Sequence, residues 1–234
     1  MTKAERKSWR IRLEQPMAPD VMIELVVELK DVLRGHMHVQ AGLEFIRDAW
    51  TAVRFARARG ADAVRLWPGE RPDCELTFQG RRDLFEIVEA DQPGRQRSAE
   101  YRDLIQRAER GESATVEDDP VEDWIARAAN GPQMLEHAAT SKAAKGYDPS
   151  VSLLIYLNLH EWDIRQQQIE VAMQPCTAAA KDAFHEVWVL WKGDAYPLWR
   201  CGEAVPMDTW PKREDEGDLL ISDAALWKSV TGGE

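Results

Sequence analysis

Residues 71–91 read RPDCELTFQGRRDLFEIVEAD, and their pattern predicts a β-hairpin. In residues 73–79 every second side chain is apolar, which is the period of a strand with one buried face. Residues 84–90 are also rich in strand-forming side chains, and the Gln79-Gly80 pair begins an expected tight turn between the two runs. With the short apolar run 63–67 before them, these segments predict an antiparallel meander of three strands.

Helical periodicity flanks this meander on both sides. Apolar side chains recur at helical spacing in residues 39–60, and a second helix is expected over 98–110. Residues 151–159 are almost entirely apolar, as in a strand buried on both faces of a sheet. The sequence predicts further helices over residues 121–130, 162–173 and 177–185, and a last strand over 185–191.

This order of elements predicts an α/β fold, a three-layer α/β/α sandwich with a mixed central sheet. A meander supplies antiparallel strands, and a helical crossover into a buried strand supplies parallel ones. Residues 131–149 carry no strong pattern. The last strand of the sheet is expected to be 185–191.

A single domain is expected over residues 1–234, because neither an internal repeat nor an interdomain linker is visible. Its core is expected to span residues 39–191. Residues 1–38 form an N-terminal addition with a short strand at 9–14 and a helix after it. Residues 192–234 form a C-terminal extension in which no long element is predicted.

Composition excludes several classes of protein. The formal net charge is −11, which disfavours a protein that coats nucleic acid through a broad basic surface. The excess acid lies after residue 100, since residues 1–100 hold 17 Lys and Arg against 17 Asp and Glu. No apolar run approaches the ~18 residues of a membrane span, and three widely spaced cysteines predict neither disulfides nor a cysteine zinc site. A cytoplasmic protein without a membrane partner is therefore expected.

Carboxylates gather where the two hairpin strands end. Asp73 begins the first strand, and Glu89 and Asp91 end the second. Because strand side chains alternate, Glu89 and Asp91 share one face, and an adjacent antiparallel strand can bring Asp73 beside them. Three converging carboxylates suit a hard divalent cation such as Mg²⁺ or Mn²⁺. The sequence therefore predicts a metal site at Asp73, Glu89 and Asp91.

These residues and the order of elements resemble the core of the PD-(D/E)XK nuclease superfamily. The resemblance covers roughly residues 39–191 and implies a restriction-endonuclease-like αβββαβ core. It makes Asp73 the motif's aspartate and Glu89 its second acid. It also implies an additional metal-site acid at Glu44, and an auxiliary polar residue at Tyr101 or Arg102.

The chain departs from this motif at its lysine, because the corresponding position holds Asp91 and the sequence reads ExD. Asp91 would then act as a third metal ligand or in place of that lysine. A second alignment takes Glu86 as the acid and puts Val88 at the lysine position. Because Glu86 and Glu89 face opposite sides of a strand, only one of them can bind the metal directly.

The resemblance implies a metal-dependent nuclease that hydrolyses phosphodiesters of DNA or RNA. Nearby arginines would contact the phosphates of such a substrate: Arg81, Arg82, Arg95, Arg97 and Arg102. One alternative is a catalytically inactive member that keeps the fold and binds a protein or nucleic-acid partner. Another is an enzyme that acts on a different phosphorylated substrate through the same carboxylates.

Overall fold

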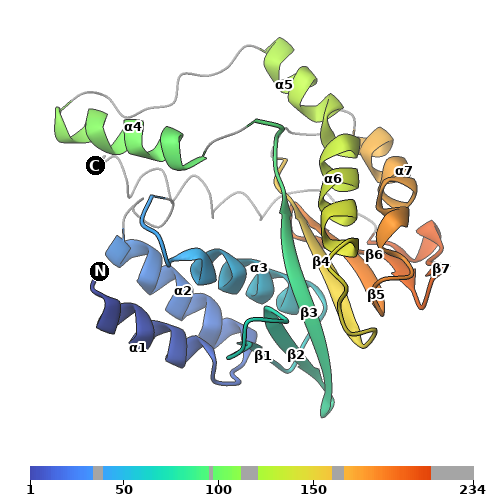
Figure 1. Cartoon of the computed structure of the whole chain (residues 1–234), viewed down its shortest axis with the longest axis horizontal. Coiled ribbons are helices and arrows are strands. Elements are labelled where there is room, and N and C mark those ends of the chain that lie inside the picture. Colours follow the sequence, from blue (N-terminus) through green and yellow to red (C-terminus); the bar gives the residue numbers. More distant parts are fainter. Residues whose placement is uncertain (34–38, 95–96, 112–120, 160–165, 212–234) are drawn as a thin grey trace.

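A seven-stranded mixed sheet forms the centre of the molecule (Figure 1). It is seen in a computed structural model that describes residues 1–33, 39–94, 97–111, 121–159 and 166–211. The strands lie in sequence order across the sheet, with β3–β4 and β4–β5 parallel and the other pairs antiparallel. Their bounds are β1 Ala63–Leu66, β2 Cys74–Phe78, β3 Arg81–Ala90, β4 Val151–Leu157, β5 Glu186–Trp191, β6 Asp194–Arg200 and β7 Glu203–Ala204.

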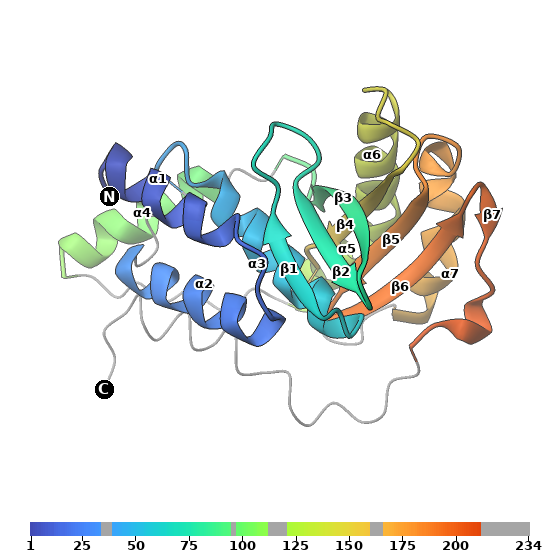
Figure 2. The same ribbon diagram turned by 90° about the horizontal axis from the view of Figure 1, so that it is seen from below.

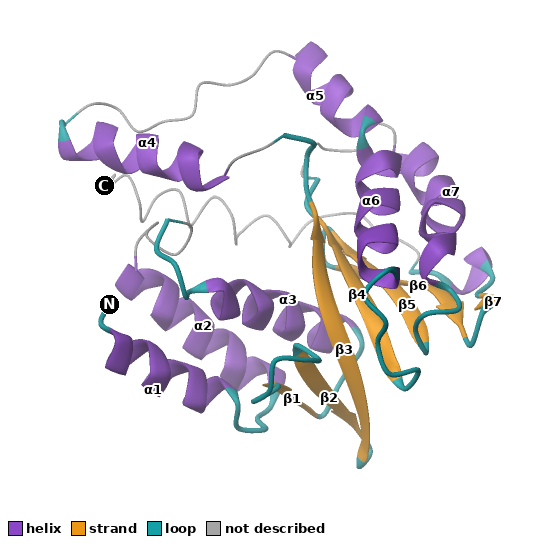
Figure 3. Ribbon diagram, in the orientation of Figure 1, coloured by secondary structure: helices purple, strands orange, loops and turns teal. Residues whose placement is uncertain are grey.

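Helices cover both faces of this sheet, so the mixed α/β architecture is confirmed (Figures 2 and 3). The N-terminal helices pack on one face, and α6 and α7 pack on the other. Within the described parts of the chain, every helix is too short or too polar to span a bilayer. The helices are α1 Lys3–Leu13, α2 Pro19–Leu33, α3 Glu44–Ala58, α4 Arg97–Glu109, α5 Val121–Ala129, α6 Gly131–Ala143 and α7 Gln166–Thr177.

Alternation along the strands creates two hydrophobic cores. In β3, Phe85 and Ile87 belong to the core beneath α3, whereas Ala90 belongs to the core beneath α6 and α7. β4 is buried on both faces along nearly its whole length, as its apolar sequence predicts. The period-2 pattern of the meander therefore determines which helices each strand residue contacts.

Strand β3 is longer than its neighbours and extends beyond one of them at each end. Its pairing with β2 covers residues 81–85, so residues 86–90 continue past the first residue of β2. Its pairing with β4 begins at Leu84, so residues 81–83 precede the start of β4. Each extension leaves one edge of β3 open to side chains from elsewhere in the chain, and both sites described below lie at these extensions.

The N-terminal segment is helical where a strand was predicted. Residues 9–14 belong to α1, and the prediction is wrong because alternation over six residues cannot be told from one face of a short helix. A capping box at the N-terminus favours the helix. The Thr2 hydroxyl accepts a hydrogen bond from the Glu5 backbone N–H, and the Glu5 carboxylate accepts one from the Thr2 backbone N–H.

Three further predictions are corrected in the second half of the chain. Residues 131–149 contain helix α6, and two strands, β6 and β7, follow the predicted last strand. Helix α7 continues through Pro175 to Thr177, where a helix over 177–185 was expected to begin; a 3₁₀ turn at Ala178–Ala180 follows instead. Pro175 lies in the last turn of α7, where few helical hydrogen bonds remain to be lost.

Candidate active site on strand β3

Asp73 lies at the point where β2 begins and β3 continues alone. Its backbone N–H donates to the carbonyl of Phe85, which extends the ladder by one residue. Its carboxylate then accepts a hydrogen bond of 2.7 Å from the backbone N–H of Ile87, a donor on the open edge of β3. Because β2 offers no backbone carbonyl to the Ile87 N–H, the Asp73 carboxylate accepts this hydrogen bond instead. The bond fixes the position of the Asp73 side chain opposite Glu86.

Glu86 is a buried carboxylate in the middle of β3, with 5% of its surface exposed. Its Oε1 lies 2.5 Å from the ammonium of Lys142 on α6 and accepts a 2.9 Å hydrogen bond from the hydroxyl of Tyr147. Its Oε2 is buried and has no hydrogen-bond partner among the described residues. A buried carboxylate is costly without partners, so the pairing with Lys142 offsets the cost of burying Glu86, and Oε2 remains available as a ligand.

Asp48 of α3 completes the arrangement from the other side of the strand edge. The pKa of Asp48 is raised to about 7, chiefly by burial and also by the negative charges of Asp73 and Glu86, whereas the cations Arg47 and Lys142 lower it. The pKa of Asp73 is also raised, chiefly by burial and also by Glu86, although the Ile87 N–H bond lowers it. The charge of Glu86 therefore raises the pKa of both Asp48 and Asp73, and the charge of Asp73 raises that of Asp48.

Together these side chains form the carboxylate cluster, defined as Asp48, Asp73, Glu86, Lys142 and Tyr147. They come from α3, the start of β2, the middle of β3, α6 and the loop after α6. The Tyr147 ring packs against Phe184, and its pKa is raised by burial and by its bond to Glu86. The pairing of β2 with β3 ends at Phe85, so no residue of β2 covers the edge of β3 beyond it. Groups from both helical layers can therefore approach the carboxylates at this edge.

The acids predicted at the end of β3 have other surroundings. Glu89 lies 3.7 Å from the guanidinium of Arg47 on α3, on the face opposite to Glu86. Asp91 accepts hydrogen bonds from the Gln92 backbone and from the Asn158 amide at 3.1 Å. At about 3.3 Å per residue, Asp91 lies roughly 16 Å further along the chain than Glu86.

Glu44 and the predicted arginines are more exposed. Glu44 lies on the first turn of α3, one turn before Asp48, and its side chain is exposed. Arg81 and Arg82 are exposed at the start of β3, and Arg102 is exposed on α4 beside the half-buried Tyr101. Arg97 begins α4, whereas Arg95 lies outside the described residues.

The structure brings Asp73 together with Glu86, the acid of the second alignment. Among the residues that the structure describes, no group of three or more His, Cys, Asp or Glu side chains is arranged to hold a metal ion. The predicted metal ligands Asp73, Glu89, Asp91 and Glu44 therefore remain a prediction.

Sequence reasoning missed Asp48, Lys142 and Tyr147. Lys142 and Tyr147 lie in residues 131–149, which carry no strong pattern, so their approach to β3 is a product of the tertiary fold. One signal was present in the sequence: Glu86 lies between Phe85 and Ile87 in a strand that packs on both faces. An acid in such a place requires a cation from another element.

A comparison of the chain with protein-family models, with curated proteins and with solved structures found no match.

Proposed function

We propose that this chain is a metal-dependent phosphodiesterase of the nuclease type, built on a restriction-endonuclease-like αβββαβ core and acting on DNA or RNA. The order α3, β1, β2, β3, helices, β4 supports this core. The observation that carries the proposal is Glu86, a buried carboxylate opposite Asp73 whose Oε1 pairs with Lys142 while its Oε2 has no partner among the described residues. This places an acid pair and a lysine at one strand edge, although the lysine comes from α6.

The residues present fit a hard divalent cation. Mg²⁺ is commonly bound through one or two carboxylates together with waters and phosphate oxygens. Asp73 and Glu86 supply two carboxylates, and the buried Oε2 of Glu86 has an unused lone pair. The pKa values of Asp73 and Asp48 are raised chiefly by burial and also by neighbouring negative charges, which a cation would offset. Bound there, Mg²⁺ or Mn²⁺ would polarise a phosphodiester oxygen and make a bound water more acidic.

Lys142 supports the proposal as a substitute for the motif's lysine, because it pairs with Glu86. Its ammonium can donate three hydrogen bonds, and the bond to Glu86 Oε1 uses one of them. The remaining donors can orient an attacking water or contact a phosphate oxygen. Val88, the residue at the lysine position of the alignment through Glu86, has no such group.

Asp48 is the proton acceptor that this arrangement offers. A general base works best when its pKa lies near the working pH, and the pKa of Asp48 is raised to about 7. In hydrolysis it would take the proton of the attacking water as the water oxygen bonds to phosphorus. The leaving oxygen would take its proton from solvent.

Cleavage of single- and double-stranded DNA and RNA with Mg²⁺ or Mn²⁺ tests the proposal, with EDTA as the blank. Asp73→Asn and Glu86→Gln are expected to lower the rate by about 100-fold or more, since each replaces a carboxylate ligand with a neutral amide. Glu89→Gln is the matched control, because it changes the same strand on the opposite face, and it is expected to retain the wild-type rate.

Equal cleavage by wild type and Glu86→Gln would overturn the proposal. Loss of activity in Glu89→Gln with retention in Glu86→Gln would show that the acid at the end of β3 is the catalytic one. Absence of cleavage together with no rise in melting temperature on adding Mn²⁺ would favour the alternative, a binding module that has lost the chemistry.

A further inference from the structure

A second polar site lies at the other end of β3. It is a pocket at the starts of β3, β4 and β5, formed where residues 81–83 precede the first residue of β4. We call it the arginine pocket, and its lining includes Arg81, Arg82, Ser150, Ser152, His185 and Glu186. Arg82 is four residues from Glu86, or about 13 Å of strand, so this pocket is separate from the carboxylate cluster.

The acids of the arginine pocket are already paired with cations of the chain. Glu186 Oε1 accepts from Arg200 at 2.8 Å, and Glu186 Oε2 accepts from the indole N–H of Trp188 at 2.8 Å. Asp83 lies 3.0 Å from Arg81. These two carboxylates are therefore paired with cations of the protein, and they orient Arg81 in the lining and Arg200 beside it.

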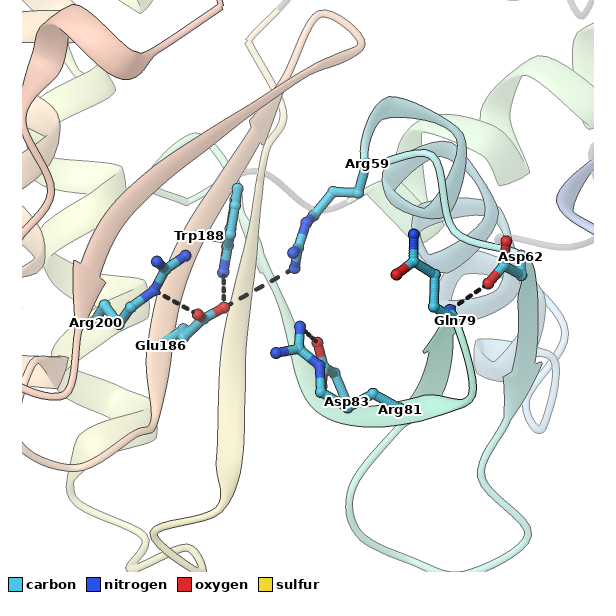
Figure 4. A network of polar contacts seen from close by, with 8 residues as sticks. All are labelled: Arg59, Asp62, Gln79, Arg81, Asp83, Glu186, Trp188 and Arg200. Atoms are coloured by element: carbon cyan, nitrogen blue, oxygen red, sulfur yellow. Dashed lines mark hydrogen bonds and ion pairs between the residues drawn. The ribbon is translucent and has the colours of Figure 1, made fainter.

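Arg59, at the C-terminal end of α3, points into the same network (Figure 4). Its guanidinium lies 4.2 Å from the centre of the Trp188 ring, and its Nη1 lies 3.9 Å from Glu186 Oε2. That distance exceeds a hydrogen bond, and the buried Nη1 has no hydrogen-bond partner among the described residues. Burial lowers the pKa of Arg59, and the charges of Glu186 and Asp83 raise it.

The charge of this region is opposite to that of the whole chain. Arg81 and Arg82 line the pocket with Asp83 and Glu186, so the charges of the lining balance. Arg59 and Arg200 pair with Glu186 from outside the lining, and Asp148 accepts a hydrogen bond from Ser150, which leaves one positive charge in excess. The chain as a whole has a formal net charge of −11. A local cationic site on an acidic protein concentrates anions at one place, because the remaining surface repels them.

We propose that the arginine pocket binds a phosphate group, either inorganic phosphate or the terminal phosphate of a nucleic acid. Guanidinium groups offer paired N–H donors that match phosphate oxygens, and the Ser152 hydroxyl and the His185 ring can add donors from other directions. The Ser150 hydroxyl donates to Asp148 instead. A phosphate monoester has a charge near −2 above about pH 6, which the excess positive charge offsets in part. This proposal does not depend on the proposed nuclease function.

Isothermal titration of the full chain with inorganic phosphate, against chloride at equal ionic strength, tests the proposal. Wild type is expected to bind phosphate, and the double variant Arg81→Gln/Arg82→Gln is expected to bind at least 10-fold more weakly. Both side chains are exposed, so this variant is expected to fold as wild type does. Arg102→Gln, an exposed arginine on α4, is the matched control and is expected to bind as wild type does.

Two further arms separate the sources of the phosphate and the two sites. A short oligonucleotide with a 5′-phosphate that binds more tightly than its 5′-hydroxyl counterpart, with the difference lost in the double variant, supports the proposal and identifies a nucleic-acid end. Glu86→Gln is expected to bind phosphate normally, whatever its effect on cleavage. Absence of phosphate binding by wild type, equal binding by wild type and the double variant, or loss of binding in Glu86→Gln alone would each overturn the proposal.

Discussion

The two ends of strand β3 have the same backbone feature but opposite charge. At its C-terminal half β3 extends past β2, and the open edge holds the carboxylate cluster with Glu86 at its centre. At its N-terminal end β3 precedes β4, and that edge holds the arginine pocket. A strand that is longer than its neighbour gives space for side chains from distant elements, and the residues placed there decide which ligand is favoured.

Burial is the second difference between the two ends. The Glu86–Lys142 pair is almost enclosed, with side-chain exposures of 6% and 13%, whereas Arg200, the partner of Glu186, is 60% exposed. Charges in the enclosed pair interact through a poorly screened medium, so they perturb the ionisation of neighbouring groups. The more open pocket is accessible to a soluble anion.

The largest expected effect is on the enclosed pair. Lys142→Met is expected to lower the free energy of unfolding by about 3–5 kcal/mol, because it leaves the Glu86 carboxylate buried without its cation. Arg200→Met at the exposed pair is expected to cost about 1 kcal/mol or less. Urea unfolding measures both.

Adding Glu86→Gln to Lys142→Met serves as a control for lost packing, since it removes the unpaired charge and is expected to restore much of the stability. If Lys142→Met costs no more than Arg200→Met, the contrast in burial has no energetic consequence.

A smaller, pH-dependent effect is expected at Asp48. Its pKa is raised from 3.8 to about 7 in the folded protein, so the folded state keeps a proton that the unfolded state loses between these values. Stability therefore falls as pH rises through this window, and the cost is fully present above pH 7, at about 4 kcal/mol as an upper limit. Asp48→Asn removes the titration, so its gain over wild type is expected to be small near pH 4 and largest at pH 8.

Unfolding curves between pH 4 and pH 8 check this expectation. Asp103→Asn, which neutralises an exposed carboxylate on α4, is the matched control and is expected to show no such rise. A gain for Asp48→Asn that does not depend on pH would contradict the electrostatic explanation.

The smallest effect is expected at the bond that closes the open edge of β3. Asp73→Ala leaves the backbone N–H of Ile87 without its acceptor and is expected to cost about 1–3 kcal/mol. Asp73→Asn keeps an oxygen that can accept this bond, so its cost is expected to be smaller, as thermal unfolding would show. Equal losses in the two variants would mean that the hydrogen bond contributes little.

The sequence predicted the order of the main elements better than the type and extent of every helix and strand. The meander, the helix before it and the buried strand all occur in the predicted order, because period-2 and period-3.6 patterns depend on burial of one face. Helix α6 and strands β6 and β7 were missed, and α1 was assigned as a strand. In these segments tertiary packing outweighs weak local patterns.

Asp73 alone, of the residues in the carboxylate cluster, was chosen from the sequence as a member of the predicted site. Its position next to a turn and at the start of a strand was readable without a structure. The choice between Glu86 and Glu89 depends on strand register, since a shift changes which side chains face each helical layer. That register is a long-range property, and so is the approach of Lys142 across 56 residues of sequence.

By itself, the sequence determined that apolar side chains alternate in the meander and that the strand over residues 151–159 is buried on both faces. It also showed that Asp73 follows Pro72 at the start of a strand. These properties are local, because the period of burial is written in adjacent residues. The tertiary structure alone decided that Glu86 pairs with Lys142 and acts on the ionisation of Asp48. It also decided that Arg59 and Arg200 converge on Glu186, beside the pocket that Arg81 and Arg82 line. Such contacts depend on the residues at which the pairing of β3 with β2 and β4 ends or begins, and no local sequence pattern predicts those residues.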